Sequence, residues 1–98
     1  MANYNDLINS SDLVLVEFFA SWCPHCQRMM PLVREAKGEL EGRCDIYQFD
    51  IDENQQLASE NGVESIPTFI LYKGGEEVWR QSGEMTLRQL VGTVENYM

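Results

Sequence analysis

The chain has 98 residues, the size of one ordinary domain, so we expect a single globular unit over residues 1–98. Hydrophobic residues make up 44% and charged residues 23%, with few glycines and prolines, which excludes a disordered or collagen-like chain. The formal net charge is −9, and so acidic a surface repels nucleic acid and anionic membranes, neither of which we expect as a partner. Three cysteines are too few for a disulfide framework and allow at most one intramolecular pair.

The first predicted elements are a buried strand and an amphipathic helix. Residues 13–19 are apolar everywhere except at Glu17 and show no alternation, which is typical of a central strand covered on both faces. Apolar residues at helical spacing over 29–40 then predict a helix that ends at Gly42.

The remaining pattern predicts a strand over 45–52, a short helix over 54–61, and two strands over 68–72 and 78–81. A glycine pair between the last two strands indicates a hairpin. Thr86, followed three residues later by Gln, has capping-box spacing and opens a final helix. The chain is therefore expected to be an α/β protein with a mixed central sheet flanked by helices.

The amino-terminal part of the chain predicts neither export nor insertion into a membrane. Residues 1–12 contain no basic region, and the apolar run 13–20 is too short for a membrane span. We therefore expect a soluble, cytoplasmic protein. Several scattered acids are interpreted as a solvated face: Asp52, Glu53, Glu60 and Glu64.

Two cysteines lie at the junction of the predicted strand and helix, in the segment Cys23-Pro24-His25-Cys26. A helix start presents unpaired N–H groups and the positive end of the helix dipole, so it stabilises a thiolate at Cys23. Cys26 lies one turn further along, where it can attack a mixed disulfide from inside the protein. Cys23 is the predicted nucleophile and Cys26 the predicted resolving thiol.

Other interpretations of the cysteines remain open. The pair could be a purely structural disulfide, but so short a loop constrains the unfolded chain little. Cys23, Cys26, Cys44 and His25 supply enough donors for zinc, although His25 lies between two of the ligands, and we expect no metal site. Cys44 heads a strand, and we interpret it as an inert, partly buried thiol, with regulatory oxidation as the alternative.

Four sequence features occur in a fixed order along the chain. They are Trp-Cys-Pro-His-Cys at 22–26 after an apolar strand, a helix with an inner proline, Asp-Ile-Asp at 50–52, and Ile-Pro-Thr at 66–68 before a hairpin. From residue 13 to 98 the chain resembles the thioredoxin family. The resemblance implies the thioredoxin fold and a monomeric thiol-disulfide oxidoreductase with no bound cofactor. It also implies disulfide-containing protein substrates and electrons from a flavoprotein similar to thioredoxin reductase.

The resemblance also assigns a substrate groove. In thioredoxins the proline of Ile-Pro-Thr is cis and faces the cysteines, so Pro67 should be cis, with Ile66 and Thr68 beside it. Trp22 and Gly83 match other groove positions of the family. These five residues are expected to hold an extended substrate segment.

Two departures concern the chemistry. Pro24 and His25 stand where thioredoxins usually carry Gly-Pro, and they resemble the dipeptide of the bacterial periplasmic disulfide oxidant. A cationic His25 would favour the Cys23 thiolate and make the disulfide more oxidising. Glu17 takes the position of the family's buried acid, which assists proton transfer at the resolving thiol, and Gln48 falls where the family carries a lysine. Without that cation a buried Glu17 should have a raised pKa.

A third departure lies at the start of the chain. Thioredoxins usually open with a strand before the first helix, and residues 1–10 are too short for both. We expect a first helix, no first strand, and one sheet edge that is exposed or differently covered.

Three of these residues also have a less specific interpretation. His25 could be a solvated side chain of little influence, Trp22 could be packing alone, and Glu17 could be partly solvated at a sheet edge. The chain as a whole could be a redox-inactive module that binds peptides in the groove around Trp22, Ile66 and Pro67. Acceleration of insulin reduction by dithiothreitol would separate an oxidoreductase from such a binder.

Overall fold

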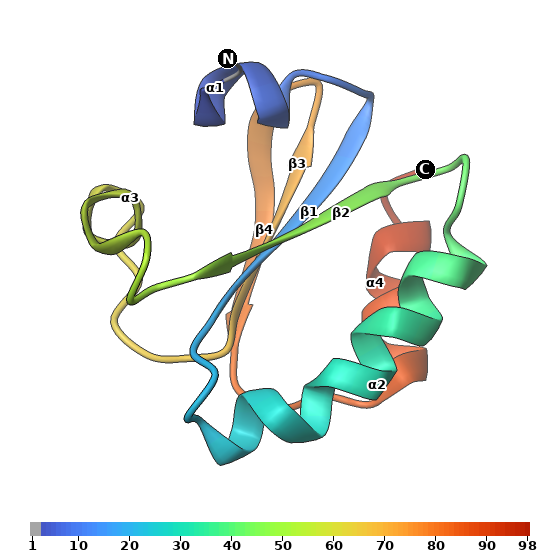
Figure 1. The fold of residues 1–98 in the computed structure, drawn as a ribbon. Coiled ribbons are helices and arrows are strands. Elements are labelled where there is room, and N and C mark those ends of the chain that lie inside the picture. Colours follow the sequence, from blue (N-terminus) through green and yellow to red (C-terminus); the bar gives the residue numbers. More distant parts are fainter. Residues whose placement is uncertain (1–2) are drawn as a thin grey trace.

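A four-stranded mixed sheet forms the centre of the structure, a computed structural model that describes residues 3–98 (Figure 1). The strand order is β2-β1-β3-β4. β1 (Leu13–Phe19) pairs in parallel with β2 (Asp45–Asp50) and antiparallel with β3 (Thr68–Lys73). β3 continues through a hairpin into antiparallel β4 (Glu76–Ser82). The predicted mixed sheet and fold class are confirmed.

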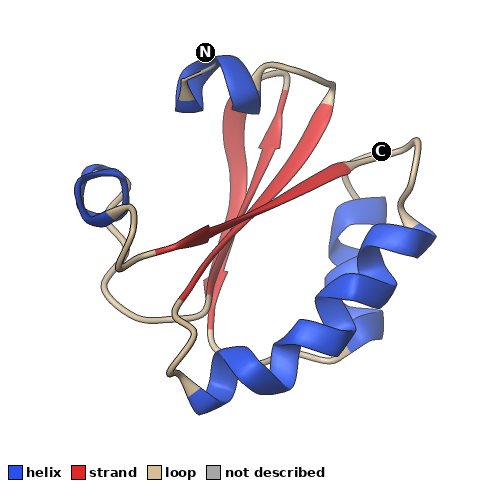
Figure 2. Cartoon of the chain, viewed as in Figure 1, coloured by secondary structure: helices blue, strands red, loops and turns tan. Residues whose placement is uncertain are grey.

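Two helices cover each face of the sheet (Figures 1 and 2). α1 (Tyr4–Ile8) and α3 (Gln55–Glu60) lie on one face. α2 (Pro24–Glu39) and α4 (Leu87–Glu95) lie on the other. This arrangement explains the continuous apolar run of β1, because successive side chains of a strand point to opposite faces and both faces are covered.

The two faces of β1 belong to two different clusters of core residues. Leu13 and Leu15 pack towards α2 and α4, whereas Val14, Val16 and Phe18 pack towards α1 and α3. Glu17 shares the parity of the first pair, so alternation directs its carboxyl to the face covered by α2. The one charged residue of the strand is thereby buried under the helix that carries the cysteines.

The carboxyl end of α2 differs from the prediction. The helix ends at Glu39 with Leu40 as its C-cap, rather than at Gly42. The N–H groups of Arg43 and Cys44 both donate to the Leu40 carbonyl, so a tight turn replaces the last helical turn. Gly42 sits inside that turn with φ +79°, a conformation that favours glycine.

The hairpin and the final helix follow their sequence signals. Gly74 and Gly75 both have positive φ in the turn between β3 and β4, as the glycine pair predicted. Thr86 caps α4 in a complete capping box with Gln89. These signals succeed because the interactions they depend on span only a few residues.

Within the part of the chain that the structure describes, β2 pairs only with β1 and forms one edge of the sheet. Within residues 3–98 no strand precedes α1, in agreement with the expectation that the first strand is missing. Among the same residues, no helix is long and apolar enough to cross a membrane.

Candidate active site

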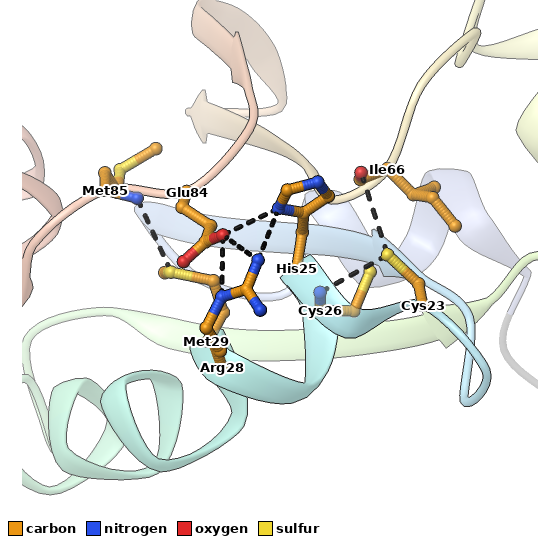
Figure 3. A network of polar contacts seen from close by, with 8 residues as sticks. All are labelled: Cys23, His25, Cys26, Arg28, Met29, Ile66, Glu84 and Met85. Carbon is orange, nitrogen blue, oxygen red and sulfur yellow. Dashed lines mark hydrogen bonds and ion pairs between the residues drawn. The ribbon is translucent and has the colours of Figure 1, made fainter.

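Cys23 and Cys26 lie at the amino end of α2, a few residues after the end of β1 (Figure 3). Cys23 is the N-cap residue, and its Sγ accepts a hydrogen bond from the backbone N–H of Cys26 at 3.3 Å. Both thiols are free, and both side chains are buried. The sulfur of Cys23 therefore stands in for the side-chain oxygen that usually caps a helix.

This geometry favours negative charge on the Cys23 sulfur. The thiolate would accept the Cys26 N–H and face the positive end of a helix of 16 residues. Pro24 occupies the first helical position, where the N–H that proline lacks would have no helical partner. On the other side, the Cys23 Sγ lies 4.0 Å from the carbonyl oxygen of Ile66.

Cys26 lies deeper than Cys23 and is only 1% exposed. Burial and the neighbouring Cys23 sulfur raise the pKa of Cys26 to about 12. The Cys26 thiol is thus protonated at neutral pH and needs a base before it can attack. The two sulfurs therefore have unequal environments, and their roles as nucleophile and resolving thiol stay a prediction.

The groove beside the cysteines has the expected backbone. The Ile66–Pro67 peptide bond is cis, and Ile66 packs against Cys23 and Cys26. The N–H of Gly83 donates to the Pro67 carbonyl at 2.8 Å, with Gly83 at φ +96°. Glycine suits this site because of the backbone conformation alone, since a Cβ would meet no atom within 4 Å.

Thr68, the last member of the Ile-Pro-Thr segment, has its side chain inside the protein. Its Oγ1 donates to the Ser65 carbonyl and lies 2.7 Å from the Ser82 hydroxyl. Thr68 can therefore meet a substrate only through its backbone. Its side chain holds the loop between α3 and β3 against the end of β4.

Trp22 is the large apolar side chain that the site exposes most, at 63%. Its Nε1 donates to Asp52 Oδ2 at 2.8 Å. The interpretation of Asp52 as part of a solvated face is therefore incomplete, because its carboxylate orients the indole. No local signal reveals this contact, since the two residues lie 30 positions apart and meet through the parallel pairing of β1 and β2.

Glu17 is fully buried, which excludes the partly solvated interpretation. Its partner in the β1–β2 register is Gln48, whose Nε2 donates to Glu17 Oε1 at 2.9 Å. Among residues 3–98, Oε2 of Glu17 has no hydrogen-bond partner. Burial raises the pKa of Glu17 to about 7, as predicted for an acid without an adjacent lysine. A carboxyl with this pKa can both take and give a proton near neutral pH.

His25 lies on the surface and faces a carboxylate rather than the sulfurs (Figure 3). Its Nδ1 is 2.6 Å from Glu84 Oε2, and Arg28 donates to the same oxygen through Nε and Nη2. Hydrogen bonds from Arg28 and His25 to this carboxylate hold the pKa of Glu84 down at about 2, with Arg28 the larger cause. Glu84 follows the groove residue Gly83 directly in the sequence, and that position was the only available hint of its place in the site.

Cys44 lies apart from this centre, in the core cluster between the sheet and α2 and α4. It is buried rather than partly buried, and this burial raises the pKa of its thiol to about 11; that the thiol is inert stays a prediction. Among the described residues, no three His, Cys, Asp or Glu side chains are grouped so that they could hold a metal ion.

Comparison with known proteins agrees with this geometry. Residues 1–96 match the family model described as Thioredoxin. The chain belongs to the thioredoxin family. A thioredoxin from Synechocystis is 37% identical over 93 residues, covering 95% of this chain and 87% of the relative. One from Staphylococcus saprophyticus is 35% identical over 97 residues, covering 99% and 92%. The chain spans only 52% of a chloroplastic thioredoxin of Arabidopsis thaliana, at 36% identity.

Solved structures of the family have the same fold. A mutant thioredoxin from Halobacterium salinarum superposes with a TM-score of 0.86 at 34% identity, covering 95% of this chain and 80% of that one. A thioredoxin from Plasmodium falciparum gives 0.87 at 29% identity, covering 97% and 91%. Thioredoxins are disulfide oxidoreductases that are reduced by thioredoxin reductase. The chain is accordingly a thiol-disulfide oxidoreductase, as its cysteine motif predicted.

Proposed function

We propose that the chain exchanges the Cys23–Cys26 dithiol for disulfides in protein substrates, with Cys23 as nucleophile, Cys26 as resolving thiol and Glu17 as base. The observation that carries the proposal is the unequal environment of the two sulfurs. Cys23 caps a helix and accepts an N–H bond, whereas the Cys26 thiol is held protonated beside a carboxyl of pKa about 7.

The reaction has two steps that balance. The Cys23 thiolate attacks one substrate sulfur; a bond between the protein and the substrate forms, and the substrate S–S bond breaks, releasing a thiolate that takes a proton from solvent. Cys26 then gives its proton to ionised Glu17 and attacks the Cys23 sulfur, and the second substrate sulfur leaves and is protonated. Two electrons pass from the dithiol to the substrate, and the reverse sequence oxidises a substrate dithiol.

The groove supplies the binding part of this proposal. Trp22 precedes Cys23 directly and presents an exposed indole, and Ile66, which precedes cis-Pro67, packs against the two cysteines. Gly83 supports Pro67 through its N–H. An extended substrate segment lying across these residues would bring its disulfide to the Cys23 sulfur, while Cys26 stays buried.

The reduction of insulin by dithiothreitol, with and without the protein, tests the function. We expect the protein to accelerate the reduction of insulin disulfides, and Cys23→Ser to abolish the acceleration because the attacking sulfur is gone. Cys44→Ala is the matched control, since it removes a buried thiol outside the site and should retain the rate. If the parent protein shows no acceleration but still binds extended peptides, the redox-inactive binding module is the correct function.

A further part of the proposal is that the disulfide is more oxidising than that of a thioredoxin with Gly-Pro between its cysteines. A cationic His25 near the helix terminus favours the thiolate and hence the reduced form. Exposure of His25 to solvent limits the effect. We expect His25→Pro to lower the reduction potential by about 30 mV, a tenfold change in equilibrium constant. Equilibration with glutathione buffers measures this potential.

Glu84→Gln is the matched contrast for this experiment. The substitution removes the negative charge that faces His25 and Arg28, so the potential should move in the opposite direction, towards a stronger oxidant. If both variants keep the parent's glutathione equilibrium, the dipeptide has no role in setting the potential.

The proposal also covers the protein's electron donor, its oligomeric state and its place in the cell. Electrons would come from a flavoprotein similar to thioredoxin reductase, the protein would act as a monomer, and it would work in the cytoplasm, where disulfides are kept reduced. Oxidation of NADPH in the presence of such a reductase, sedimentation and cell fractionation test the three statements in turn.

A further inference from the structure

A chain of three polar side chains connects the surface of α2 to the buried carboxyl of Glu17. Lys37 Nζ donates to Gln48 Oε1 at 3.0 Å, and Gln48 Nε2 donates to Glu17 Oε1 at 2.9 Å. The three residues come from α2, β2 and β1. Neither of these bonds can be read from the sequence, because Lys37 and Glu17 each lie many positions from Gln48.

Lys37 determines which way the Gln48 amide faces. An ammonium group can only donate hydrogen bonds, so it requires the carbonyl end of the amide. The NH₂ end must then point inwards, where it meets Glu17 Oε1. The opposite orientation would set the NH₂ against the ammonium and the carbonyl oxygen against the carboxylate. The exposed lysine therefore selects the orientation in which the amide favours an ionised Glu17.

The surroundings of Glu17 contain few other charges. α2 contributes Lys37 and the Cys26 thiol, β2 contributes Gln48, and β3 places apolar Phe69 opposite Glu17. Desolvation therefore opposes the ionisation of Glu17, whereas the hydrogen bond from Gln48 and the charge of Lys37 favour it. The second oxygen of Glu17, Oε2, accepts no hydrogen bond from any residue that the structure describes.

We propose that Lys37 is a positioning residue for the resolving step: through Gln48 it holds one oxygen of Glu17 and sets the pH range in which the other oxygen accepts a proton from Cys26. The proposal rests on the proposed function, in which Glu17 is the base. Lys37, an exposed residue of α2, would thus favour the ionised form of Glu17, as a lysine directly beside the carboxyl would.

Paired charge removals on α2 test the relay. Lys37→Met and Arg34→Met each remove one positive charge from the same helix, and Arg34 makes no hydrogen bond or ion pair within residues 3–98. The pKa of Glu17 is followed by carbon NMR of the carboxyl, with Glu17→Gln identifying the signal. We expect Lys37→Met to raise this pKa by about half a unit, as for a cation acting at several ångströms through a partly aqueous path. Arg34→Met should leave it in place, and Lys37→Arg should restore the parent value.

The rate of mixed-disulfide resolution, measured against pH in single turnover, gives the second readout. Its midpoint should rise with the pKa of Glu17 in Lys37→Met and stay unchanged in Arg34→Met. Equal pKa values in the two variants would overturn the relay. A shifted pKa with an unshifted rate profile would overturn the role of Lys37 in resolution together with the base role of Glu17. Disulfide exchange itself is judged separately, by the insulin assay.

Discussion

A Cys26→Ser variant is expected to accumulate as a mixed disulfide with its substrate and to lose catalytic turnover. Cys23 keeps its helix cap and its attack on the substrate, but no internal thiol remains to break the new bond. An intramolecular thiol acts at a very high effective concentration, so release of the second substrate thiol should slow on the order of 10³-fold or more. Single-turnover release of the thiol, with mass spectrometry of the adduct, measures both effects.

Two double variants show which sulfur holds the adduct. Combining Cys26→Ser with Cys44→Ala should leave trapping intact, because Cys44 lies in a different part of the core. Combining it with Cys23→Ser should abolish trapping. Adducts that persist without Cys23, or a Cys26→Ser variant that turns over at the parent rate, would contradict the two-step mechanism.

A Glu17→Gln variant is expected to become more stable than the parent as the pH rises. The pKa of Glu17 is about 7 in the folded protein and near 4.5 when the group is free, so between these values the folded state binds the extra proton. The parent's free energy of unfolding should therefore fall from about pH 4.5 to pH 7 and level off above that range. The amide does not titrate, so its advantage over the parent should grow by about 3 kcal/mol across this interval.

Denaturant unfolding of both proteins at several pH values measures this difference. Glu77 and Glu84 have lowered pKa values, so they contribute stability that is lost only at lower pH and that is common to both proteins. A difference that stays constant between pH 4 and pH 8 would mean that folding does not raise the pKa of Glu17. The same variant should resolve mixed disulfides more slowly, since the base is gone, and equal rates would remove Glu17 from the mechanism.

These two effects of Glu17 have opposite signs, which is the usual relation between stability and activity at a functional site. A carboxyl in the middle of a central strand destabilises the fold once it ionises, because burial penalises its charge. Its electrostatic interaction with Cys26, which it is proposed to serve as a base, gives a reason for this cost in stability.

Local patterns in the sequence were enough to predict the elements, the class of fold and the placing of Cys23 and Cys26 at the start of a helix. The strand around Glu17, the glycine pair of the hairpin and the capping box at Thr86 depend on burial or bonding within a few residues. The C-x-x-C pair at a strand-to-helix junction is likewise a local arrangement, since the helix start stabilises the Cys23 sulfur wherever the rest of the chain lies.

The contacts that adjust this chemistry come from pairing and packing across the fold. Asp52 reaches Trp22 because β1 and β2 lie side by side, and Glu84 reaches His25 because the segment after β4 passes the start of α2. Lys37 acts on Glu17 only through the β1–β2 register that sets Gln48 beside it. Such partners depend on register and helix placement, which are properties of the whole folded chain, whereas the reactive sulfurs depend on a single turn of helix.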